Sequence, residues 1–322
     1  MTLSDQVVAS EPLGSAGASG NTLERVTLRD GRRLIRKRVS PEWDWLSRAT
    51  GDDGRALWMW RNGLFDRIPA ALEHATVAVE EDGAAWTVFM RDVSDAMVPG
   101  EQRVDRDAVQ RVLAAMAEMH LAFWGERFPA LCSLEQRYQL LSPETARREV
   151  ELGYTTSDLI PRCWAMFREL ADPDIARAIM TIVERPSLLA GQLDKCEPTL
   201  IHGDVRLSNL GFAGERVVLI DWGERSGTAP AAVDLASFLA FDARQMDVSR
   251  DDVISDFREL YGERHDERAL QLALIGGMVQ LAPHLVLEYV LKGGDDHRAA
   301  ALGEIAWWTE KVQAAFETWS PV

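Results

Sequence analysis

The chain has 322 residues, with a formal net charge of −16 and a pI near 4.9. This length leaves room for two domains or for one domain with two lobes, and the hydrophobic content of 47% can supply a substantial core. The acidic balance argues against a nucleic-acid partner, because phosphate backbones are bound by clustered Lys and Arg side chains. An acidic protein can attract a cationic substrate, but much of this charge is expected on solvated surface.

The spacing of the cysteines and the distribution of apolar residues indicate the cellular compartment in which the protein is expected. The three cysteines are widely spaced and form no Cys-x-x-Cys pair, so neither a zinc site nor a disulfide framework is expected. The N-terminus lacks a basic segment followed by an apolar run, and we expect no signal peptide. The apolar stretch Leu272–Leu291 contains Gln280, Pro283 and His284, which favours a helix of a packed bundle over a membrane span. We therefore expect a cytoplasmic protein without a membrane partner.

The first 24 residues contain three closely spaced glycines, Gly14, Gly17 and Gly20, and a nearby hydroxyl on Ser19. Glycines allow main-chain amides to approach phosphate oxygens, and a serine can add a hydroxyl contact. The segment therefore fits either a flexible leader or a phosphate-binding loop, and its position just before a hairpin supports the loop.

Two β-hairpins are expected next. In the first, Arg25–Leu28 and Arg33–Val39 are joined at Asp30-Gly31, which is a strong hairpin signal. In the second, Val77–Glu80 and Trp86–Met90 flank another turn that contains glycine. The N-terminal part of the chain is therefore expected to be rich in β-structure.

Most of the remaining chain shows helical signals. Residues Arg55–Pro69 have helical character, and apolar residues recur at helical spacing over Asp105–Phe123, where His120 is expected to be a packed core histidine. Further helices are predicted over Leu134–Leu141, Pro143–Leu152, Pro161–Leu170 and Asp174–Glu184, with three more helical stretches in residues 250–322.

Residues 199–223 carry the strongest functional signal. Two apolar runs, Thr199–Ile201 and Val217–Ile220, each end at a turn that bears an aspartate. We expect these runs to pair in the manner of a β-hairpin, which would bring Asp204, Asn209 and Asp221 close together. Two carboxylates and an amide that converge on one point suit a hard cation, Mg²⁺ above all.

The spacing within this stretch resembles a known family. Histidine, one residue, aspartate, four residues, asparagine and a later Asp-aromatic-Gly is the arrangement of the protein-kinase catalytic loop and metal aspartate. Gly203 before Asp204, and Asp221 between Ile220 and Trp222, resemble the aminoglycoside phosphotransferase and choline kinase branch of this superfamily. The resemblance implies an α+β, bilobal protein-kinase-like fold. Residues 1–93 would form a small β-rich nucleotide-binding lobe, and residues 94–322 a larger, mainly helical lobe for catalysis and substrate binding.

The resemblance also implies roles for individual residues, with ATP and Mg²⁺ as cofactors. Asp204 would be the base that accepts the proton of the substrate hydroxyl, and Arg206 would lie near the γ-phosphate. Asn209 and Asp221 would hold the metal ions that bridge the ATP phosphates. Lys37 would pair with the α- and β-phosphates; the alternative is a solvated lysine on a basic edge strand.

Further nucleotide contacts follow from the same resemblance. Gly17 and Ser19 would belong to the phosphate loop. Met90, Asp92 and Val93 would lie at the hinge beside the adenine, where the alternative is a plain strand exit. Asp234 would buttress the catalytic loop, and its place before an apolar helix also suggests an N-cap.

One feature departs from the family pattern. The N-lobe helix should carry a glutamate that pairs with the lysine, but Ala56 occupies its expected position. No glutamate lies between Trp43 and Leu72. Asp52 or Asp53, about one helical turn earlier, is the nearest candidate to replace it.

These observations predict an enzyme that moves the γ-phosphoryl group of ATP to a hydroxyl of a small molecule. An aminoglycoside-like antibiotic, an amino sugar or an amino alcohol would fit, and each of these acceptors can be cationic. Glu224, Asp242 and Glu288 are candidates to hold such a cation. The alternatives are Ser/Thr phosphorylation of a peptide partner, and a degraded kinase that binds nucleotide as a scaffold.

Overall fold

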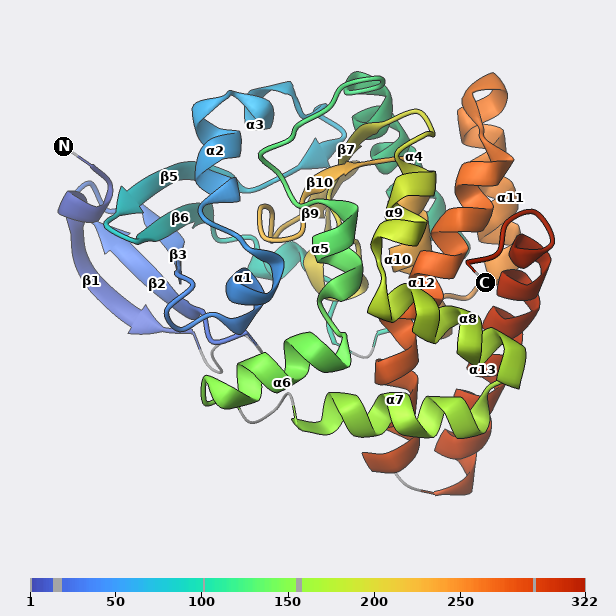
Figure 1. The fold of residues 1–322 in the computed structure, drawn as a ribbon. Helices are drawn as coiled ribbons and strands as arrows, with labels where there is room; N and C mark the ends of the chain where they lie inside the picture. The colour runs from blue at the N-terminus through green and yellow to red at the C-terminus, as the bar shows by residue number, and fades with distance from the viewer. Residues whose placement is uncertain (1, 14–18, 101, 155–157, 292–293, 322) are drawn as a thin grey trace.

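The computed structural model describes residues 2–13, 19–100, 102–154, 158–291 and 294–321. An antiparallel sheet lies on one side of the molecule and a large group of helices on the other (Figure 1). The sheet is built from the N-terminal part of the chain and the helices mainly from the rest, so the predicted α+β class with a β-rich N-terminal and a helical C-terminal lobe is confirmed. The lobe boundary at residue 93 stays a prediction.

The N-terminal sheet has five strands in the order β1-β2-β3-β6-β5. Both predicted hairpins are confirmed, with slightly longer strands than expected. The strands are β1 (Val7–Pro12), β2 (Thr22–Leu28), β3 (Arg33–Val39), β5 (Thr76–Asp82) and β6 (Ala85–Arg91). Strand β1 was not predicted; it pairs with β2, and residues 14–18 of the glycine-rich segment lie outside the described residues.

Three short helices connect β3 to the second hairpin: α1 (Trp45–Thr50), α2 (Arg55–Arg61) and α3 (Leu64–Arg67). Helix α1 begins at Asp44, whose carboxylate accepts hydrogen bonds from the main-chain amides of Leu46 and Ser47 at 2.7 and 3.0 Å. A side-chain acceptor at this position satisfies amides that have no partner within the helix. The cap therefore explains why a helix starts directly after the basic strand β3.

The strands around the polar loop pair differently from the prediction. Strand β7 (Thr199–Ile201) pairs with β10 (Gly227–Ala229), whereas β9 (Arg216–Leu219) lies between β4 (Leu72–Glu73) and β8 (Leu210–Ala213). The expected pairing of 199–201 with 217–220 is therefore wrong. Strand β8, which lies directly before the second run, is the hairpin partner of β9. Strand β10, which follows the Asp-Trp-Gly turn, pairs with β7. The two aspartate-bearing turns still meet, because both sheets pack on the same core.

Ten α-helices of the described chain form the C-terminal part. The predicted helices are confirmed, and α9, which has no side-chain cap, was missed. Their bounds are α4 (Arg106–Ala122), α5 (Leu134–Gln139), α6 (Pro143–Glu151), α7 (Leu159–Leu170), α8 (Pro173–Glu184), α9 (Ser187–Leu193), α10 (Ala232–Asp242), α11 (Arg250–Tyr261), α12 (Glu267–Leu291) and α13 (Asp295–Phe316).

Helix α12 is the one helix in the described residues that is long and apolar enough to cross a membrane. In this fold, 83% of its apolar window is buried inside the protein, against α7, α10 and α13 among others. It therefore forms the centre of the helical region, as predicted for this stretch, and its apolar composition is explained by packing.

Candidate active site

A buried aspartate of α10 supports the loop that follows β7. The carboxylate of Asp234 accepts hydrogen bonds from the main-chain amides of His202 and Gly203, each at 2.8 Å. It also lies 3.1 Å from Nε2 of His120. Burial alone would raise the pKa of Asp234, but the bond to His120 and nearby positive charge lower it. Asp234 lies within the first turn of α10 and Ala231 is the N-cap, so the predicted cap is wrong and the predicted buttress is what the structure shows.

His202 connects this loop to the end of β9. Its Nδ1 accepts a hydrogen bond from the amide of Asp204 at 3.2 Å, so Nε2 carries the proton and donates to the oxygen of Ile220 at 3.0 Å. Burial lowers the pKa of His202, which keeps the ring neutral. His202 therefore braces the loop, as expected, and orients the residues on both sides of the cleft.

Gly203 allows two segments to cross at close range. Its φ is +84°, and a Cβ atom at this position would lie 1.9 Å from the oxygen of Arg225. Only glycine tolerates both the backbone conformation and the contact. The glycine before Asp204 therefore lets segment 221–225 lie directly over the catalytic loop.

Most of the predicted site residues line one cleft of about 350 Å³. Asn209 donates from Nδ2 to the main-chain oxygen of Asp204 at 3.0 Å and to its carboxylate at 3.2 Å. Asp221 has a φ of +70°, a strained conformation for a residue other than glycine and one that is concentrated at functional sites. The cleft lining includes Ser19, Lys37, Met90, Asp204, Arg206, Asn209 and Asp221.

The donors in this cleft fit Mg²⁺. Within the described residues, no group of three or more His, Cys, Asp and Glu side chains forms a metal cluster. The protein instead offers the carboxylate of Asp221 and the amide oxygen of Asn209, whose nitrogen is committed to Asp204. Mg²⁺ is commonly held by one or two protein oxygen ligands while waters and substrate phosphates complete its shell. This sparse set of hard oxygen donors matches that chemistry.

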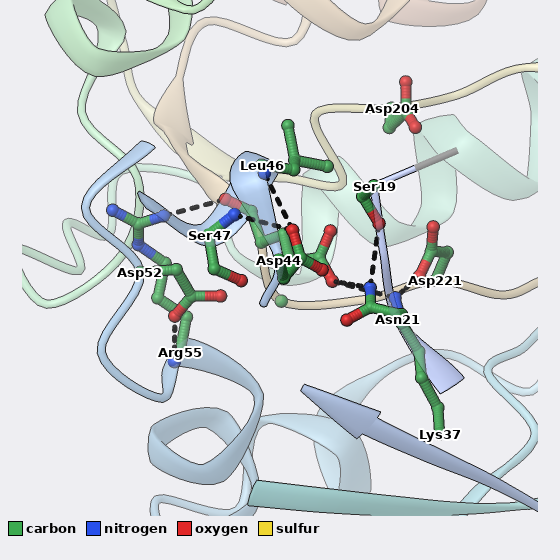
Figure 2. Close-up of polar contacts among 12 residues, drawn as sticks. Ser19, Asn21, Lys37, Asp44, Leu46, Ser47, Asp52, Arg55, Asp204 and Asp221 are labelled. Carbon is green, nitrogen blue, oxygen red and sulfur yellow. Dashed lines mark hydrogen bonds and ion pairs between the residues drawn. The ribbon is translucent and has the colours of Figure 1, made fainter. Parts of the chain in front are cut away.

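Lys37 reaches into the cleft from β3. Its ammonium donates to Asp221 Oδ1 and, over 2.8 Å, to Glu224 Oε1 (Figure 2 shows the lysine and Asp221). Burial alone would lower the pKa of Lys37, but the charges of Asp221 and Glu224 raise it, so the side chain is charged. The alternative of a solvated lysine on an edge strand is wrong, because β3 is an inner strand and the Lys37 side chain is 12% exposed.

The structure explains the missing helix glutamate. Ala56 is buried, and a Cβ atom built on Gly223 would lie 2.8 Å from its Cβ, so α2 packs directly on the segment after Asp221. Asp52 accepts hydrogen bonds from the amides of Gly54, the N-cap of α2, and of Arg55, its first residue, and Asp53 is exposed. The expectation that Asp52 or Asp53 replaces the glutamate is therefore wrong.

Only some of the residues that were predicted to contact the nucleotide line the cleft. Ser19 lines the cleft, and its Oγ accepts a hydrogen bond from Asn21 Nδ2 at 3.0 Å. Met90 also lines it, whereas Asp92 and Val93 are outside the lining residues, and Asp92 binds Arg25 over 2.8 Å. Gly17 lies outside the described residues.

Sequence reasoning missed Arg225, whose Nη1 lies 2.6 Å from Asp204 Oδ1. It also missed Asn21, which donates to Glu224 over 3.0 Å. Arg206 lines the cleft as predicted and places its guanidinium 4.8 Å from the ring centre of Phe241. Arg225 and Glu224 could have been noticed because they directly follow the Asp-Trp-Gly motif. Their partners Asp204 and Lys37 lie in other parts of the sequence, so the pairs themselves could not be predicted.

Two acidic residues proposed to hold a cationic substrate have internal partners instead. Asp242 is buried and accepts a hydrogen bond from the amide of Leu207 at 2.8 Å, and burial raises its pKa to about 7. Glu224 is buried against Lys37, and burial raises its pKa to about 7 although the lysine charge opposes the shift. Each carboxylate therefore has a partner inside the protein, and a role for either of them in holding an acceptor stays a prediction. The side chain of Glu288 lies outside the described part of the chain.

Comparison with known proteins identifies relatives of this fold. Residues 13–271 match the sequence model of the phosphotransferase enzyme family. No curated protein matches the chain. Among solved structures, an amicoumacin kinase in complex with AMP-PNP, Ca²⁺ and amicoumacin is 14% identical with a TM-score of 0.53, covering 97% of this chain and 89% of that one.

Two further structures cover both chains almost completely. An aminoglycoside phosphotransferase from Alicyclobacillus acidocaldarius is 17% identical with a TM-score of 0.51, covering 97% of this chain and 91% of that one. A choline/ethanolamine kinase family protein from Mesorhizobium loti is 16% identical with a TM-score of 0.51, covering 95% and 92%. At these identities the likeness concerns the fold, and it confirms the kinase-like architecture.

Proposed function

The chain belongs to the phosphotransferase enzyme family, and we propose that it transfers the γ-phosphoryl group of ATP to a hydroxyl of a small molecule with Mg²⁺ as cofactor. The observation that carries this proposal is the convergence of Lys37, Asp204, Asn209 and Asp221 on one cleft. These residues come from segments far apart in the chain, and together they offer a base, a cation for phosphate and oxygen donors for metal.

In the proposed reaction, the acceptor oxygen forms a bond to the γ-phosphorus as the bond to the bridging β–γ oxygen breaks. Asp204 accepts the hydroxyl proton, and ADP leaves. Lys37 and Arg206 bind phosphate oxygens, and Asn209 and Asp221 hold the metal. When bound, Mg²⁺ neutralises charge on the triphosphate. Phosphoryl transfer depends mainly on positioning and on charge stabilisation, which this set of side chains supplies.

The ion pair at Asp204 supports an acceptor that bears an amine. Arg225 places a guanidinium 2.6 Å from the carboxylate, so the proposed base already binds a cationic group in this structure. An amine next to the reacting hydroxyl can replace that guanidinium without leaving Asp204 unpaired. Similar structures named as aminoglycoside phosphotransferase and choline/ethanolamine kinase family protein suggest which amines to test first. We propose amino sugars, aminoglycosides and amino alcohols as the acceptor classes.

The test is ADP release with Mg·ATP across a panel of these compounds, each paired with an analogue that keeps the hydroxyls and lacks the amine. Asp204→Asn serves as the blank. Stimulation by one compound that is absent from the blank supports the proposal, and a larger effect than its neutral analogue supports a cationic acceptor. A silent panel with Mg·ATP still bound would move the proposal to a peptide acceptor or a scaffold.

A further inference from the structure

Glu224 lines the cleft and is held by groups from three segments of the N-terminal lobe. Lys37 of β3 donates to Oε1 over 2.8 Å, and Asn21, just before β2, donates to the same oxygen over 3.0 Å. Arg55 of α2 donates to the main-chain oxygen of Glu224 over 2.8 Å. The glutamate side chain is 8% exposed. Such enclosure gives the carboxylate one orientation, aimed at the lysine.

Among the described residues, the two carboxylates that accept a hydrogen bond from Lys37 are those of Asp221 and Glu224. Asp221 also contacts the lysine, but it is the proposed metal ligand, and a lysine held by Asp221 alone would compete with the metal. Asp52 is committed to the start of α2, as Figure 2 shows by its bond to Arg55. Ala56 on the helix packs against Gly223, which leaves no path for a longer side chain.

We propose that Glu224 is the positioning residue for the phosphate-binding lysine, taking the place of the carboxylate that the N-lobe helix lacks. This inference rests on the proposed function, because it assigns Lys37 to the phosphates of ATP. Glu224 follows Asp221 by three residues, so one segment positions both the lysine and the metal ligand. The absence of a helix glutamate is then compatible with an active enzyme.

The experiment measures binding of Mg·ATP by calorimetry, which requires no knowledge of the acceptor. Glu224→Gln keeps the shape of the side chain and removes its charge. We expect the dissociation constant to rise by about tenfold or more, because the lysine then pairs with Asp221 and opposes metal binding. Glu304→Gln is the matched control: Glu304 is also a buried glutamate in an ion pair, here with Arg250, but it is not among the residues that line the cleft. This variant should bind Mg·ATP as the unmodified protein does.

A double-mutant cycle separates positioning from a general structural role. In a Lys37→Ala background, Glu224→Gln should cause no further loss of affinity, because its effect acts through the lysine. Equal losses in both backgrounds would overturn the inference, as would normal affinity in Glu224→Gln. If thermal melting shows that Glu224→Gln is unfolded, Glu224→Asp carries the test, since it keeps the charge but shortens the reach; we expect a smaller loss that again vanishes with Lys37→Ala.

The outcomes also separate this inference from the proposed function. Failure of the unmodified protein to bind Mg·ATP would overturn both. Normal binding that is weakened by Lys37→Ala but unaffected by Glu224→Gln would overturn the role of Glu224 alone. Once an acceptor is known, the loss in Glu224→Gln should appear mainly in KM for ATP, with the KM for the acceptor unchanged.

Discussion

The two polypeptide segments that face each other across the cleft are held in different ways. The catalytic loop, residues 202–209, is supported within the C-terminal lobe, where Asp234 and Asp242 of α10 accept its main-chain amides. Segment 221–225 is held by side chains of the other lobe, with Lys37 and Arg55 as its partners. The loop is therefore positioned from one side, whereas the segment depends on contacts between lobes.

This difference suggests a division of labour. A loop that is braced by buried hydrogen bonds can hold a base at a constant place, which favours chemistry that relies on positioning. A segment whose partners lie on the nucleotide-binding lobe can respond to what the cleft contains. We expect changes at the base Asp204 and at the support of its loop to affect turnover or stability, and changes at Asp221 and Glu224 to affect nucleotide binding.

The largest effect is expected at the base. Asp204→Asn keeps the size of the side chain and removes the proton acceptor, and turnover should fall at least about 10²-fold. Binding of Mg·ATP should be unchanged, because Asp204 is assigned to the proton of the acceptor hydroxyl and not to the metal or the phosphates. The measurement is ADP release with the acceptor found in the panel, together with calorimetry of the nucleotide. Near-normal turnover would remove Asp204 from the role of base.

A change in the facing segment should act on the metal. Asp221→Ala removes the one carboxylate proposed as a metal ligand, so the Mg²⁺-dependent part of ATP binding should disappear. Calorimetry with and without Mg²⁺ measures this directly. An unchanged dependence on Mg²⁺ in the variant would rule out Asp221 as a metal ligand.

The support beneath the loop should appear in stability. Asp234→Ala leaves the buried amides of His202 and Gly203 without their acceptor, which should cost about 3 kcal/mol of unfolding free energy. Chemical denaturation measures the loss, and Asp107→Ala, an exposed change in the first turn of α4, is the control. A loss no greater than the control would show that the loop does not depend on this brace.

A further effect is expected in the pH dependence of stability. Because the folded-state pKa of Asp242 is raised to about 7, the folded protein holds its proton more tightly than the unfolded chain does. The resulting stability is present below about pH 4 and is lost as pH rises through 7. Asp242→Asn removes this dependence, so the variant should gain stability relative to the unmodified protein between pH 5 and pH 8, by about 4 kcal/mol at most. A difference that stays constant over this range would contradict the assignment.

Local patterns explain which features could be predicted from sequence. The spacing of Asp204 and Asn209 reflects a short loop whose geometry depends on neighbouring residues, and the hairpin at Asp30-Gly31 depends on its own turn. The proximity of Asp204 and Asn209 and the hairpin at Asp30-Gly31 were therefore both predicted correctly. The lysine partner could not be found in this way, because Glu224 meets Lys37 only after the two lobes have packed.

The wrong predictions have the same physical origin. Short strands such as β7 and β9 choose their partners by tertiary packing, and residues 227–229 supply an edge that the apolar pattern does not reveal. From the sequence, Glu224 and Asp242 were candidates to hold a cationic substrate, whereas in the fold both are buried and each has a partner inside the protein. Long-range partners are therefore the part of the site that required the structure.

The most direct test of the proposed site is a calorimetric titration of the unmodified protein with ATP, first with Mg²⁺ and then with a chelator. We predict saturable binding with the metal, and binding weaker by about tenfold or more without it, because Asp221 and Asn209 hold the phosphates only through a cation. No saturable binding at millimolar Mg·ATP would contradict the assignment of this cleft to a nucleotide.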